Sequence, residues 1–417
     1  MKIAIVGSGI SGLAAGWLLN RKHEVHLFEK RPRLGGHTHT VVHDLDGREL
    51  PLDTGFIVYN EKTYPNLTRA FAELEVETQA SDMSFSVSSR NPDVEYASHS
   101  LPGLFAQPSL LLSATHLRML IDVIRFGRRG RRLLAGPGDP DATIADFLED
   151  GGFSDAFATY FLFPMTAAIW SSGTELVTGF PRDPLLRFLD NHGLLQVTGQ
   201  PEWRTVVGGS SSYIAPMVRE FKDRVHLGLG VDRIVRGSGD VDIRLEDGSR
   251  HLFDHVVVAA HADQALKMLA DPTPEERALL GAWSYSINHT WLHTDTTLMP
   301  RRRRAWASWN YLMTDGKSPQ DRASVSYHLN RLQGLQEERE YMVTLNPEHE
   351  PAPESVVRRM DYAHPVYNAD SVATQADLPH LNGHKRTHFC GAYFANGFHE
   401  DGLNSATAVA DDLGVVF

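Results

Sequence analysis

A glycine-rich turn between a buried strand and a helix, near residue 1, limits the fold more than any other feature of the sequence. Residues 2–6 (KIAIV) form a short apolar run of the kind that is buried on both faces of a parallel sheet. They lead into residues 7–12, which match the pattern G-x-G-x-x-G, and then into a helical stretch over residues 13–21. A second strand at residues 24–28 ends at Glu29. This order predicts the first βαβ unit of a Rossmann-type domain.

Each glycine of this turn has its own physical function. Gly7 permits the tight turn, Gly9 lets the backbone approach a pyrophosphate, and Gly12 lets the helix pack close to the strand. The helix N-terminus offers unpaired N–H groups and its positive dipole end to the phosphates. Glu29 can accept hydrogen bonds from a ribose diol, and its charge disfavours the 2′-phosphate of NADP. The expected dinucleotide contacts are Gly7, Gly9, Ile10, Ser11, Gly12 and Glu29.

The segment that follows Glu29 distinguishes FAD from NAD. Residues 29–37 (EKRPRLGGH) place an acid, a basic loop and a second glycine pair in succession. This segment resembles the extended dinucleotide signature of the flavin amine oxidase superfamily, which includes the monoamine and polyamine oxidases and the carotenoid desaturases. The resemblance implies that the glycine pair lies against the pyrophosphate and flavin, and that Arg33, or else Arg31, assists. It adds to the expected contacts Lys30, Arg33, Gly35, Gly36 and His37.

The region after residue 386 contains a second strand–glycine–helix unit. Residues 387–391 (THFCG) predict a strand that ends in glycine, residues 397–402 a turn, and residues 403–413 an alanine-rich helix. The unit resembles the second FAD contact of the same superfamily, in which the helix N-terminus points at the flavin pyrimidine. The contacts that this resemblance implies are Gly391, Asp401, Gly402 and Leu403.

This region departs from the superfamily in two ways. Ala392 and Tyr393 stand where the amine oxidases have an acidic residue for the ribityl chain, so Asp401, Glu400 or backbone groups would take that role. Cys390, the only cysteine, lies inside the predicted strand and is not a plausible covalent tether. We therefore expect FAD to bind non-covalently.

The middle of the chain indicates the same architecture. Residues 225–235 resemble the superfamily segment whose backbone contacts the adenine side, with Val231 as the expected contact. Residues 204–213 look like the glycine turn that returns the chain to the FAD domain. The predicted fold is α/β. Its Rossmann-type FAD-binding domain is discontinuous and comprises residues 1–75, 204–265 and 380–417. Its α+β substrate domain comprises residues 76–203 and 266–379.

Three further segments carry a closer resemblance. Residues 52–67, 305–311 and 397–402 together resemble a bacterial subfamily of FAD/NAD-binding oxidoreductases related to the amine oxidases. Members of that subfamily are associated with cyclopropane-type fatty acid methyltransferases and with methylated or furan fatty acid pathways. The resemblance implies a modified acyl chain as substrate. It also adds cofactor contacts at Thr54, Gly55 and Phe56.

Candidate catalytic groups lie near the last helix. Flavin accepts a hydride or its equivalent at N5, and amine oxidases commonly hold a water there with a lysine. Residues 283–293 contain no lysine and offer His289 and His293 instead. His399, with Glu400 beside it, is the first choice as acid or base because imidazole titrates near neutrality. The alternative is that His399 only caps the last helix.

Other polar and aromatic side chains leave alternatives open. The aromatic set of the middle region could cage an amine, line an acyl tunnel or belong to the core. Its members are Trp306, Trp309, Tyr311, Tyr327 and His328. No catalytic metal is expected, because no helical H-x-x-x-H pair with a carboxylate occurs.

Residues 101–132 combine an apolar stretch with six arginines that only Asp122 offsets. A basic amphipathic helix of this kind is typical of a membrane-surface segment, which an enzyme acting on lipid chains would need. The alternative is a helix that covers the core and leaves its arginines in solvent. We find no signal-peptide pattern and no apolar run long enough to span a membrane. We expect a cytoplasmic protein, with peripheral contact at the inner membrane face as an option.

The composition of the chain argues against some classes of binding partner and leaves others open. The net charge of −12 argues against general nucleic-acid binding, which needs a basic face. A single cysteine excludes an intramolecular disulfide and fits a reducing compartment. No second G-x-G-x-x-G module for NAD(P)H is visible, so oxygen, a quinone or a protein are all open as electron acceptors.

These features predict an FAD-dependent oxidoreductase. The leading specific function is a dehydrogenase or desaturase of modified fatty acyl chains. An FAD-dependent amine oxidase, which the missing lysine disfavours, is the second. A carotenoid-type desaturase or a redox-neutral flavin isomerase is the third, and a flavin-binding partner protein without turnover is the fourth.

Overall fold

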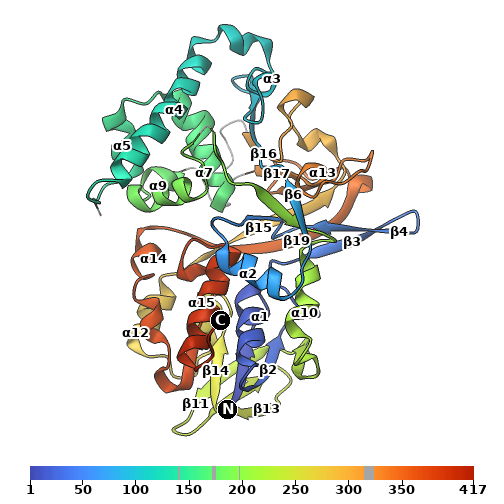
Figure 1. Cartoon of the computed structure of the whole chain (residues 1–417), viewed down its shortest axis with the longest axis vertical. Helices are drawn as coiled ribbons and strands as arrows, with labels where there is room; N and C mark the ends of the chain where they lie inside the picture. Colours follow the sequence, from blue (N-terminus) through green and yellow to red (C-terminus); the bar gives the residue numbers. More distant parts are fainter. Residues whose placement is uncertain (140, 171–174, 197, 314–323) are drawn as a thin grey trace.

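The computed structural model describes residues 1–139, 141–170, 175–196, 198–313 and 324–417. A parallel sheet lies in the lower half of the molecule, near both chain termini (Figure 1). A second, mixed sheet lies above it, and a group of helices between residues 101 and 191 occupies the upper end. The two sheets divide the molecule into a lower and an upper part.

The parallel sheet has five strands in the order β10-β2-β1-β14-β20. Their bounds are Lys2–Val6 (β1), Glu24–Glu29 (β2), Val225–Leu227 (β10), His255–Val258 (β14) and Thr387–Phe389 (β20). Successive side chains of the central strand β1 enter opposite cores: Ile3 and Ile5 on one face, Ala4 and Val6 on the other. Burial on both faces explains why this strand is a continuous apolar run, and it confirms the predicted α/β class.

Helices cover one face of this sheet and strands cover much of the other. The first face packs against α1 (Ile10–Leu19), α10 (Ile214–Val218) and α15 (His399–Asp412). The second packs against an antiparallel sheet and two helices. Their bounds are Val231–Arg236 (β11), Val241–Leu245 (β12), Arg250–Phe253 (β13), Ala262–Met268 (α11) and Pro274–Gly281 (α12). Both α1 and α15 begin three or four residues before their predicted starts, because the glycine turn and the acidic residues form their first turns.

The upper part is built on a seven-stranded sheet of order β19-β15-β18-β17-β16-β7-β8. Its bounds are Phe85–Ser89 (β7), Val94–Ala97 (β8), Tyr285–His293 (β15), Trp309–Met313 (β16), Ser324–His328 (β17), Met342–Leu345 (β18) and Val356–Pro365 (β19). Small sheets join the two parts. They comprise Thr40–Leu45 (β3), Arg48–Asp53 (β4), Val58–Asn60 (β5), Thr78–Ser81 (β6) and Trp203–Val206 (β9).

Residues 101–132 do not form one helix. They form α3 (Leu101–Leu104), the 3₁₀ turn η1 (Pro108–Leu112) and most of α4 (Ala114–Leu134). Pro102 and Pro108 each stand in the first turn of a new helical segment, where a missing N–H costs nothing. The other helices are α2 (Pro65–Glu73), α5 (Ile144–Gly151), α6 (Asp155–Phe157), α7 (Phe163–Trp170), α8 (Glu175–Thr178), α9 (Arg182–Asn191), α13 (Leu329–Leu332) and α14 (Ala369–Ala373).

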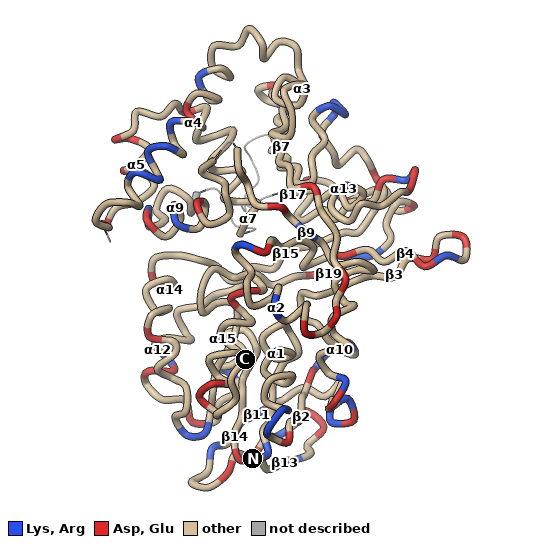
Figure 2. Tube along the Cα trace, in the orientation of Figure 1, with Lys and Arg blue, Asp and Glu red and all other residues tan. Residues whose placement is uncertain are grey.

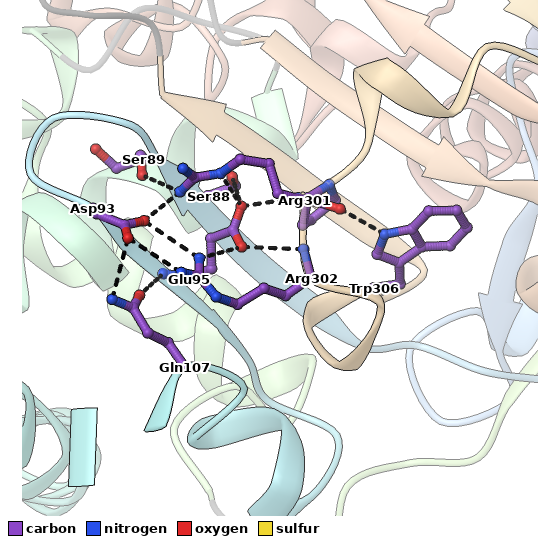
Figure 3. A network of polar contacts seen from close by, with 9 residues as sticks. Ser88, Ser89, Asp93, Glu95, Gln107, Arg301, Arg302 and Trp306 are labelled. Carbon is purple, nitrogen blue, oxygen red and sulfur yellow. Dashed lines mark hydrogen bonds and ion pairs between the residues drawn. The ribbon is translucent and has the colours of Figure 1, made fainter. Parts of the chain in front are cut away.

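A polar network fastens the segment before β16 to the β7–β8 hairpin (Figure 3). Glu95 is fully buried and accepts hydrogen bonds from the side chains of Arg301 (3.1 Å) and Arg302 (2.8 Å) and from both backbone N–H groups. Asp93 pairs with the same two arginines. Burial alone would raise the pKa of Glu95, but these hydrogen bonds outweigh it and lower the pKa. The network therefore holds a charged carboxylate and two arginines in fixed positions.

Candidate functional site

The turn between β1 and α1 depends on two glycines that have no room for a side chain. Gly7 has a φ of 101°, and a Cβ there would lie 2.6 Å from the Ala259 carbonyl oxygen. A Cβ on Gly12 would lie 2.0 Å from the Gly7 carbonyl oxygen. No flexible side chain can move to relieve either contact, since both involve backbone atoms. The helix can approach the strand this closely only with glycine at both positions.

Gly9, between them, faces open space. A Cβ added at Gly9 would meet nothing within 4 Å, and its backbone (φ −64°) suits any residue. Gly9 is also the N-cap of α1, where no side chain caps the helix, and the first turn has no acidic residue. The N–H groups of the first turn and the positive end of the helix dipole therefore point at a free region, as an anion site requires.

The second glycine pair lies across from Gly9. Gly35 (φ 108°) donates its N–H to the Ser8 carbonyl oxygen at 3.0 Å, so the two glycine loops are joined. A Cβ on Gly36 (φ 60°) would lie 2.9 Å from the Gly9 Cα. These two loops form what we call the glycine cradle, residues 7–12 and 35–36. Its walls are backbone, which allows close approach of a phosphate.

Glu29 is oriented by the cradle itself. Its carboxylate accepts hydrogen bonds from the Ser8 N–H (3.0 Å), the Ser8 hydroxyl (2.6 Å) and the Arg31 N–H (2.8 Å). Carboxylate oxygens have about four acceptor sites, so capacity remains for a ribose hydroxyl. Val231 begins β11, just after Leu229, whose N–H binds the Glu29 carbonyl oxygen at 3.1 Å. Val231 thus lies near the end of β2, on the predicted adenine side.

The two basic residues predicted as contacts behave differently. Arg33 donates to the Gly36 carbonyl oxygen at 2.9 Å and to the Thr38 carbonyl oxygen at 3.4 Å, so it braces the second glycine loop. Burial lowers the pKa of Arg33. Lys30 is 72% exposed in its side chain and pairs with Glu246 at 2.6 Å. Arg33 is therefore placed to support the cradle, whereas the ammonium of Lys30 is engaged at the surface.

Residues 37–39 run beside residues 54–56. The N–H of Phe56 donates to the His37 carbonyl oxygen, and the N–H of Thr54 to the His39 carbonyl oxygen, each at 2.9 Å. A Cβ on Gly55 would lie 2.0 Å from the His37 carbonyl oxygen. The structure therefore brings together the predicted contacts Thr54, Gly55, Phe56 and His37. Tyr362 of β19, which sequence reasoning missed, bonds both Thr54 (2.7 Å) and His39 (2.8 Å) through its hydroxyl.

Helix α15 begins against α1. A Cβ on Gly402 would lie 2.7 Å from Ile10 Cγ2 and 2.8 Å from Ser11 Oγ. Gly391 donates its N–H to Ser405 Oγ at 2.9 Å, and Leu403 is fully buried in the core around α1. The predicted contacts Gly402 and Leu403 thus pack against α1, whereas Gly391 is bound to α15 itself.

The two carboxylates at the start of α15 bind backbone groups. Asp401 accepts hydrogen bonds from the N–H groups of Phe398 (2.9 Å) and Asn396 (3.1 Å). Burial raises the pKa of Asp401 to about 6. Glu400 accepts from the N–H groups of Asn66 (3.0 Å) and Leu67 (2.9 Å) and so caps α2. Both carboxylates are engaged in positioning the chain, and their predicted ribityl-binding and catalytic roles gain no support from these contacts.

His399 joins α15 to the loop after the cradle. Its ring stacks on Phe56 with centroids 3.8 Å apart, and its Nε2 lies 3.0 Å from Thr38 Oγ1. Burial lowers the pKa of His399 to about 3. The side chain is therefore neutral near pH 7, where it can exchange a hydrogen bond but supplies no positive charge.

Other histidines around this loop are neutral for the same reason. Burial lowers the pKa of His39 and of His364 to about 4 each, and lowers the pKa of His37 well below its usual value. The ring of His37 lies 5.2 Å from that of His364 and 6.3 Å from that of His261. Nε2 of His37 is buried without a hydrogen-bond partner among the described residues. This cluster provides neutral polar atoms, one of them still unpaired.

Aromatic side chains from α7, α9 and the turn before α15 meet beside His399, and sequence reasoning missed this group. The ring of Phe188 lies 4.7 Å from that of Trp170, 4.1 Å from that of His192 and 5.2 Å from that of Phe398. The ring of Trp170 also lies 5.7 Å from that of Phe180. We call these five residues the aromatic junction. Phe188 is buried and the other four are only partly buried, so the junction forms a partly accessible edge of the upper core.

Two buried hydroxyls lie next to the aromatic junction. Tyr367 has its ring 6.3 Å from that of Trp170, and Tyr393 has its ring 5.6 Å from that of Trp283. Neither hydroxyl has a hydrogen-bond partner among the described residues. No local motif signals these residues, because they come from segments far apart in the sequence.

The remaining predicted residues are engaged elsewhere. His289 is exposed and pairs with Asp361, and His293 is buried against Thr344. Trp306 donates to the Pro300 carbonyl oxygen, and His328 pairs with Glu340. Trp309, Tyr311 and Tyr327 pack in the upper core. Cys390 is fully buried, and burial raises the pKa of its thiol to about 12, so it stays protonated.

One known protein family matches nearly the whole chain. The family described as flavin containing amine oxidoreductase matches residues 10–414. Among curated proteins, an uncharacterised protein of Methanocaldococcus jannaschii is 61% identical over 36 residues. That stretch spans 9% of this chain and 9% of that protein.

Solved structures share the fold over almost their whole length. A fatty acid isomerase of P. acnes described as CLA-producing matches with a TM-score of 0.70 at 15% identity, over 99% of this chain and 98% of that one. Wild-type putrescine oxidase bound to putrescine matches with a TM-score of 0.68 at 16% identity, over 99% of each chain. Cyclohexylamine oxidase of Brevibacterium oxydans matches with a TM-score of 0.63 at 16% identity, again over 99% of each chain.

Proposed function

This chain belongs to the flavin containing amine oxidoreductases and is an FAD-dependent oxidoreductase, and we propose that it dehydrogenates modified, methylated fatty acyl chains. The observation that carries the proposal is the aromatic junction. It offers partly exposed apolar rings beside the start of α15, while both nearby carboxylates, Glu400 and Asp401, are bound to backbone N–H groups. Such a surface suits a hydrocarbon chain better than a cation.

The cradle fits FAD. The pyrophosphate would lie at the uncapped start of α1, where Gly9 leaves space, and Glu29 would accept from the adenosine ribose. The unpaired Nε2 of His37 is a further polar atom available to the cofactor. When bound, FAD supplies the acceptor for a hydride. Since α15 starts against α1, the aromatic junction lies on the side of the cradle where the flavin end of FAD is expected.

The chain's own residues then have two tasks toward the substrate. Trp170, Phe180 and Phe398 would pack along the acyl chain and exclude water from the reacting carbons, and the buried ring of Phe188 would support them. Burial lowers the pKa of His192, so this side chain adds no charge to the apolar surface. His399 would hold Thr38 and Phe56 in place without donating a positive charge, since burial keeps its pKa at about 3.

The solved structures provide precedent for more than one substrate class. One is described as a fatty acid isomerase, so the same fold is used on fatty acids in that protein. Another is bound to putrescine, so the same fold also accommodates an amine. These likenesses support the fold only. The choice of an acyl chain rests on the aromatic junction and its engaged carboxylates.

An amine oxidase is the second candidate. Aromatic faces attract cations, and the rings of Trp170 and Tyr367 lie 6.3 Å apart, close enough to flank a small ammonium group. Against this, burial raises the pKa of both carboxylates at the start of α15, Glu400 and Asp401, which disfavours the charged forms that would bind a cation.

Anaerobic reduction of the FAD-loaded protein separates the two candidates. We would mix it with a dispersed phospholipid that carries a methyl-branched acyl chain, and separately with putrescine, and follow the visible flavin absorbance. The proposal expects bleaching by the lipid alone. Phe188→Ala and Phe398→Ala should slow bleaching about tenfold or more, because each removes a packing surface. Phe417→Ala, which removes a ring packed against Trp17, serves as the control. Bleaching by putrescine alone would refute the proposal in favour of the second candidate.

A further inference from the structure

Exposed apolar side chains gather at the upper end of the molecule. Of the large hydrophobic side chains that are exposed in the described part of the chain, six lie between residues 101 and 124. They are Leu101 (73% exposed), Leu111 (55%), Leu112 (92%), Leu117 (41%), Ile121 (53%) and Ile124 (42%). The others are spread singly over the rest of the chain, which is normal for a soluble surface. A concentration of this kind marks an interaction surface.

Three of these side chains share one face of α4, and the others come from the two segments directly before it. Leu117, Ile121 and Ile124 follow the helical spacing of α4, and Leu111 and Leu112 lie in η1 directly before it. In Figure 1, α3 and the start of α4 form the end of the molecule farthest from the parallel sheet. We call residues 101–124 the apolar tip.

The same face of α4 becomes basic after the tip. The next exposed positions are Arg128, Arg131 and Arg132. Figure 2 shows several basic positions along α4 and a mostly uncharged end of the molecule above it. Arg131 lies about 10 Å from Ile124 along the axis of α4. Arg128, Arg131 and Arg132 would therefore lie near the lipid phosphates when the apolar tip inserts. We call these three arginines the basic collar.

The collar is not neutralised within the part of the chain that the structure describes. No ion pair joins Arg128, Arg131 or Arg132 to any described residue. Asp122, the only acidic residue of α4, is fully buried and pairs with Arg118 and Arg125. The arginine run before β16 shows the opposite arrangement. Arg301 and Arg302 pair with Asp93 and Glu95 (Figure 3), and Arg303 pairs with Glu340.

The apolar tip is followed by an unpaired basic collar. This combination is complementary to the surface of an anionic bilayer. Apolar side chains enter the boundary between head groups and acyl chains, and arginines bind the lipid phosphates. A second copy of this chain fits less well, because a two-fold contact would place each basic collar against its own copy. None of the helices in the described ranges is long and apolar enough to span a membrane, which leaves attachment from one side.

We propose that the apolar tip and its collar, residues 101–132, dock the protein onto the surface of anionic membranes. Docking is independent of turnover and stands even if the substrate is not an acyl chain. It also suits the proposed function. Gly127 packs so closely on the Leu195 carbonyl that a Cβ would lie 2.2 Å from its oxygen, and Gly130 packs on Leu186 of α9. Both glycines are on the buried face of α4, and α9 carries Phe188, so α4 lies between the docked face and part of the aromatic junction.

Vesicle binding of the full-length, FAD-loaded protein tests this proposal. We expect it to sediment with vesicles of phosphatidylcholine and phosphatidylglycerol but not with phosphatidylcholine alone. Replacing Arg128, Arg131 and Arg132 by Gln should weaken binding about fivefold for each arginine. The double variant Leu111→Ser/Leu112→Ser should weaken it about tenfold or more at any salt concentration.

Matched control variants test whether vesicle binding depends on the tip and its collar or only on the overall charge and hydrophobicity of the protein. Arg219, Arg277 and Arg304 are exposed and form no ion pair with any residue that the structure describes, and their replacement by Gln should leave binding unchanged. The double variant Leu227→Ser/Leu252→Ser removes two other exposed leucines and should also have no effect. Failure of the wild type to bind, or equal losses in the controls, would overturn the proposal.

Two further readouts decide what covers the tip. A Leu112→Trp variant should shift its emission to the blue and be quenched by brominated acyl chains when anionic vesicles are added. Sedimentation velocity without lipid should show one species for the wild type and the Leu111→Ser/Leu112→Ser variant. A dimer that only the leucine replacements dissociate would assign the tip to self-association and refute the membrane proposal. If the vesicle-bound Leu112→Trp protein were not quenched by brominated acyl chains, the tip would not insert, and this too would refute the membrane proposal.

Discussion

Helices α1 and α15 start against each other but in opposite ways. The first turn of α1 has no side-chain cap and no acidic residue, and the space in front of Gly9 is open. The first turn of α15 holds Glu400 and Asp401, and Asp401 accepts hydrogen bonds from the N–H groups around that turn. The start of α1 is therefore left open for an anion, whereas the start of α15 carries two carboxylates that bind backbone N–H groups of the turn before it and of α2. The same local motif, a glycine turn before a helix, serves two purposes.

The largest expected effect comes from closing the α1 turn. Gly12→Val should destabilise the protein by about 3 kcal/mol and abolish FAD binding, because its Cβ would lie 2.0 Å from a backbone oxygen. Gly239→Ala, at a glycine with nothing within 4 Å, is the control and should change stability by less than about 0.5 kcal/mol. Urea unfolding and FAD titration measure both. A stable, FAD-binding Gly12→Val protein would contradict the packing described for this turn.

The next effect concerns His399 at the start of α15. Its pKa is about 3 in the folded protein and near 6.5 when unfolded, so the unfolded state takes up protons first as the pH falls. The stability that neutral His399 contributes is complete above pH 6.5 and is lost as the pH falls toward 3. From pH 7 to pH 5, His399→Gln should therefore lose about 2 kcal/mol less unfolding free energy than the wild type. An unchanged profile in His399→Gln would show that His399 is not held neutral.

Gly9→Ala tests whether the open space at Gly9 is needed for FAD binding or for the packing of the protein. The added methyl meets nothing within 4 Å, and the backbone at Gly9 suits alanine, so the stability of the FAD-free protein should not change. FAD affinity should fall about tenfold, equivalent to about 1.4 kcal/mol, because the methyl enters the region assigned to the pyrophosphate. Isothermal titration with FAD gives the affinity. Wild-type affinity in this variant would show that the pyrophosphate lies elsewhere.

The smallest effect is expected at the cap of α15. Asp401→Ala removes the acceptor for two N–H groups and should cost about 1 kcal/mol of stability at pH 7. FAD affinity should change less than about threefold if this carboxylate only caps the helix. Thermal unfolding and FAD titration test the two statements separately. A loss of affinity as large as that of Gly9→Ala would give Asp401 a direct role at the cofactor.

The N-terminal half of the site could be predicted because it is made of backbone. A tight turn, a close helix and an open approach each require glycine at a fixed spacing, so Gly7, Gly9 and Gly12 are visible in one sequence. The five-stranded sheet was predictable for a related reason. Its strands are buried on both faces and form short apolar runs, as residues 2–6 and 255–258 show.

The rest depended on contacts between distant segments. Nothing near Glu400 indicates that its carboxylate would cap α2, more than three hundred residues earlier in the chain. Lys30 is likewise engaged by Glu246 of a different strand pair. The aromatic junction unites α7, α9 and residue 398, none of which carries a motif. A side chain that can cap, pair or bind a ligand is assigned only when its neighbours are known.

The mass of the acyl chain after one anaerobic turnover tests the proposed function most directly. FAD-loaded protein would be mixed with phospholipid carrying a methyl-branched acyl chain, and the released acyl chains analysed by mass spectrometry alongside the flavin absorbance. We predict that each equivalent of FAD reduced yields one acyl chain that is lighter by two hydrogens. An acyl chain of unchanged mass, with the flavin still oxidised or the double bond merely moved, would contradict dehydrogenation.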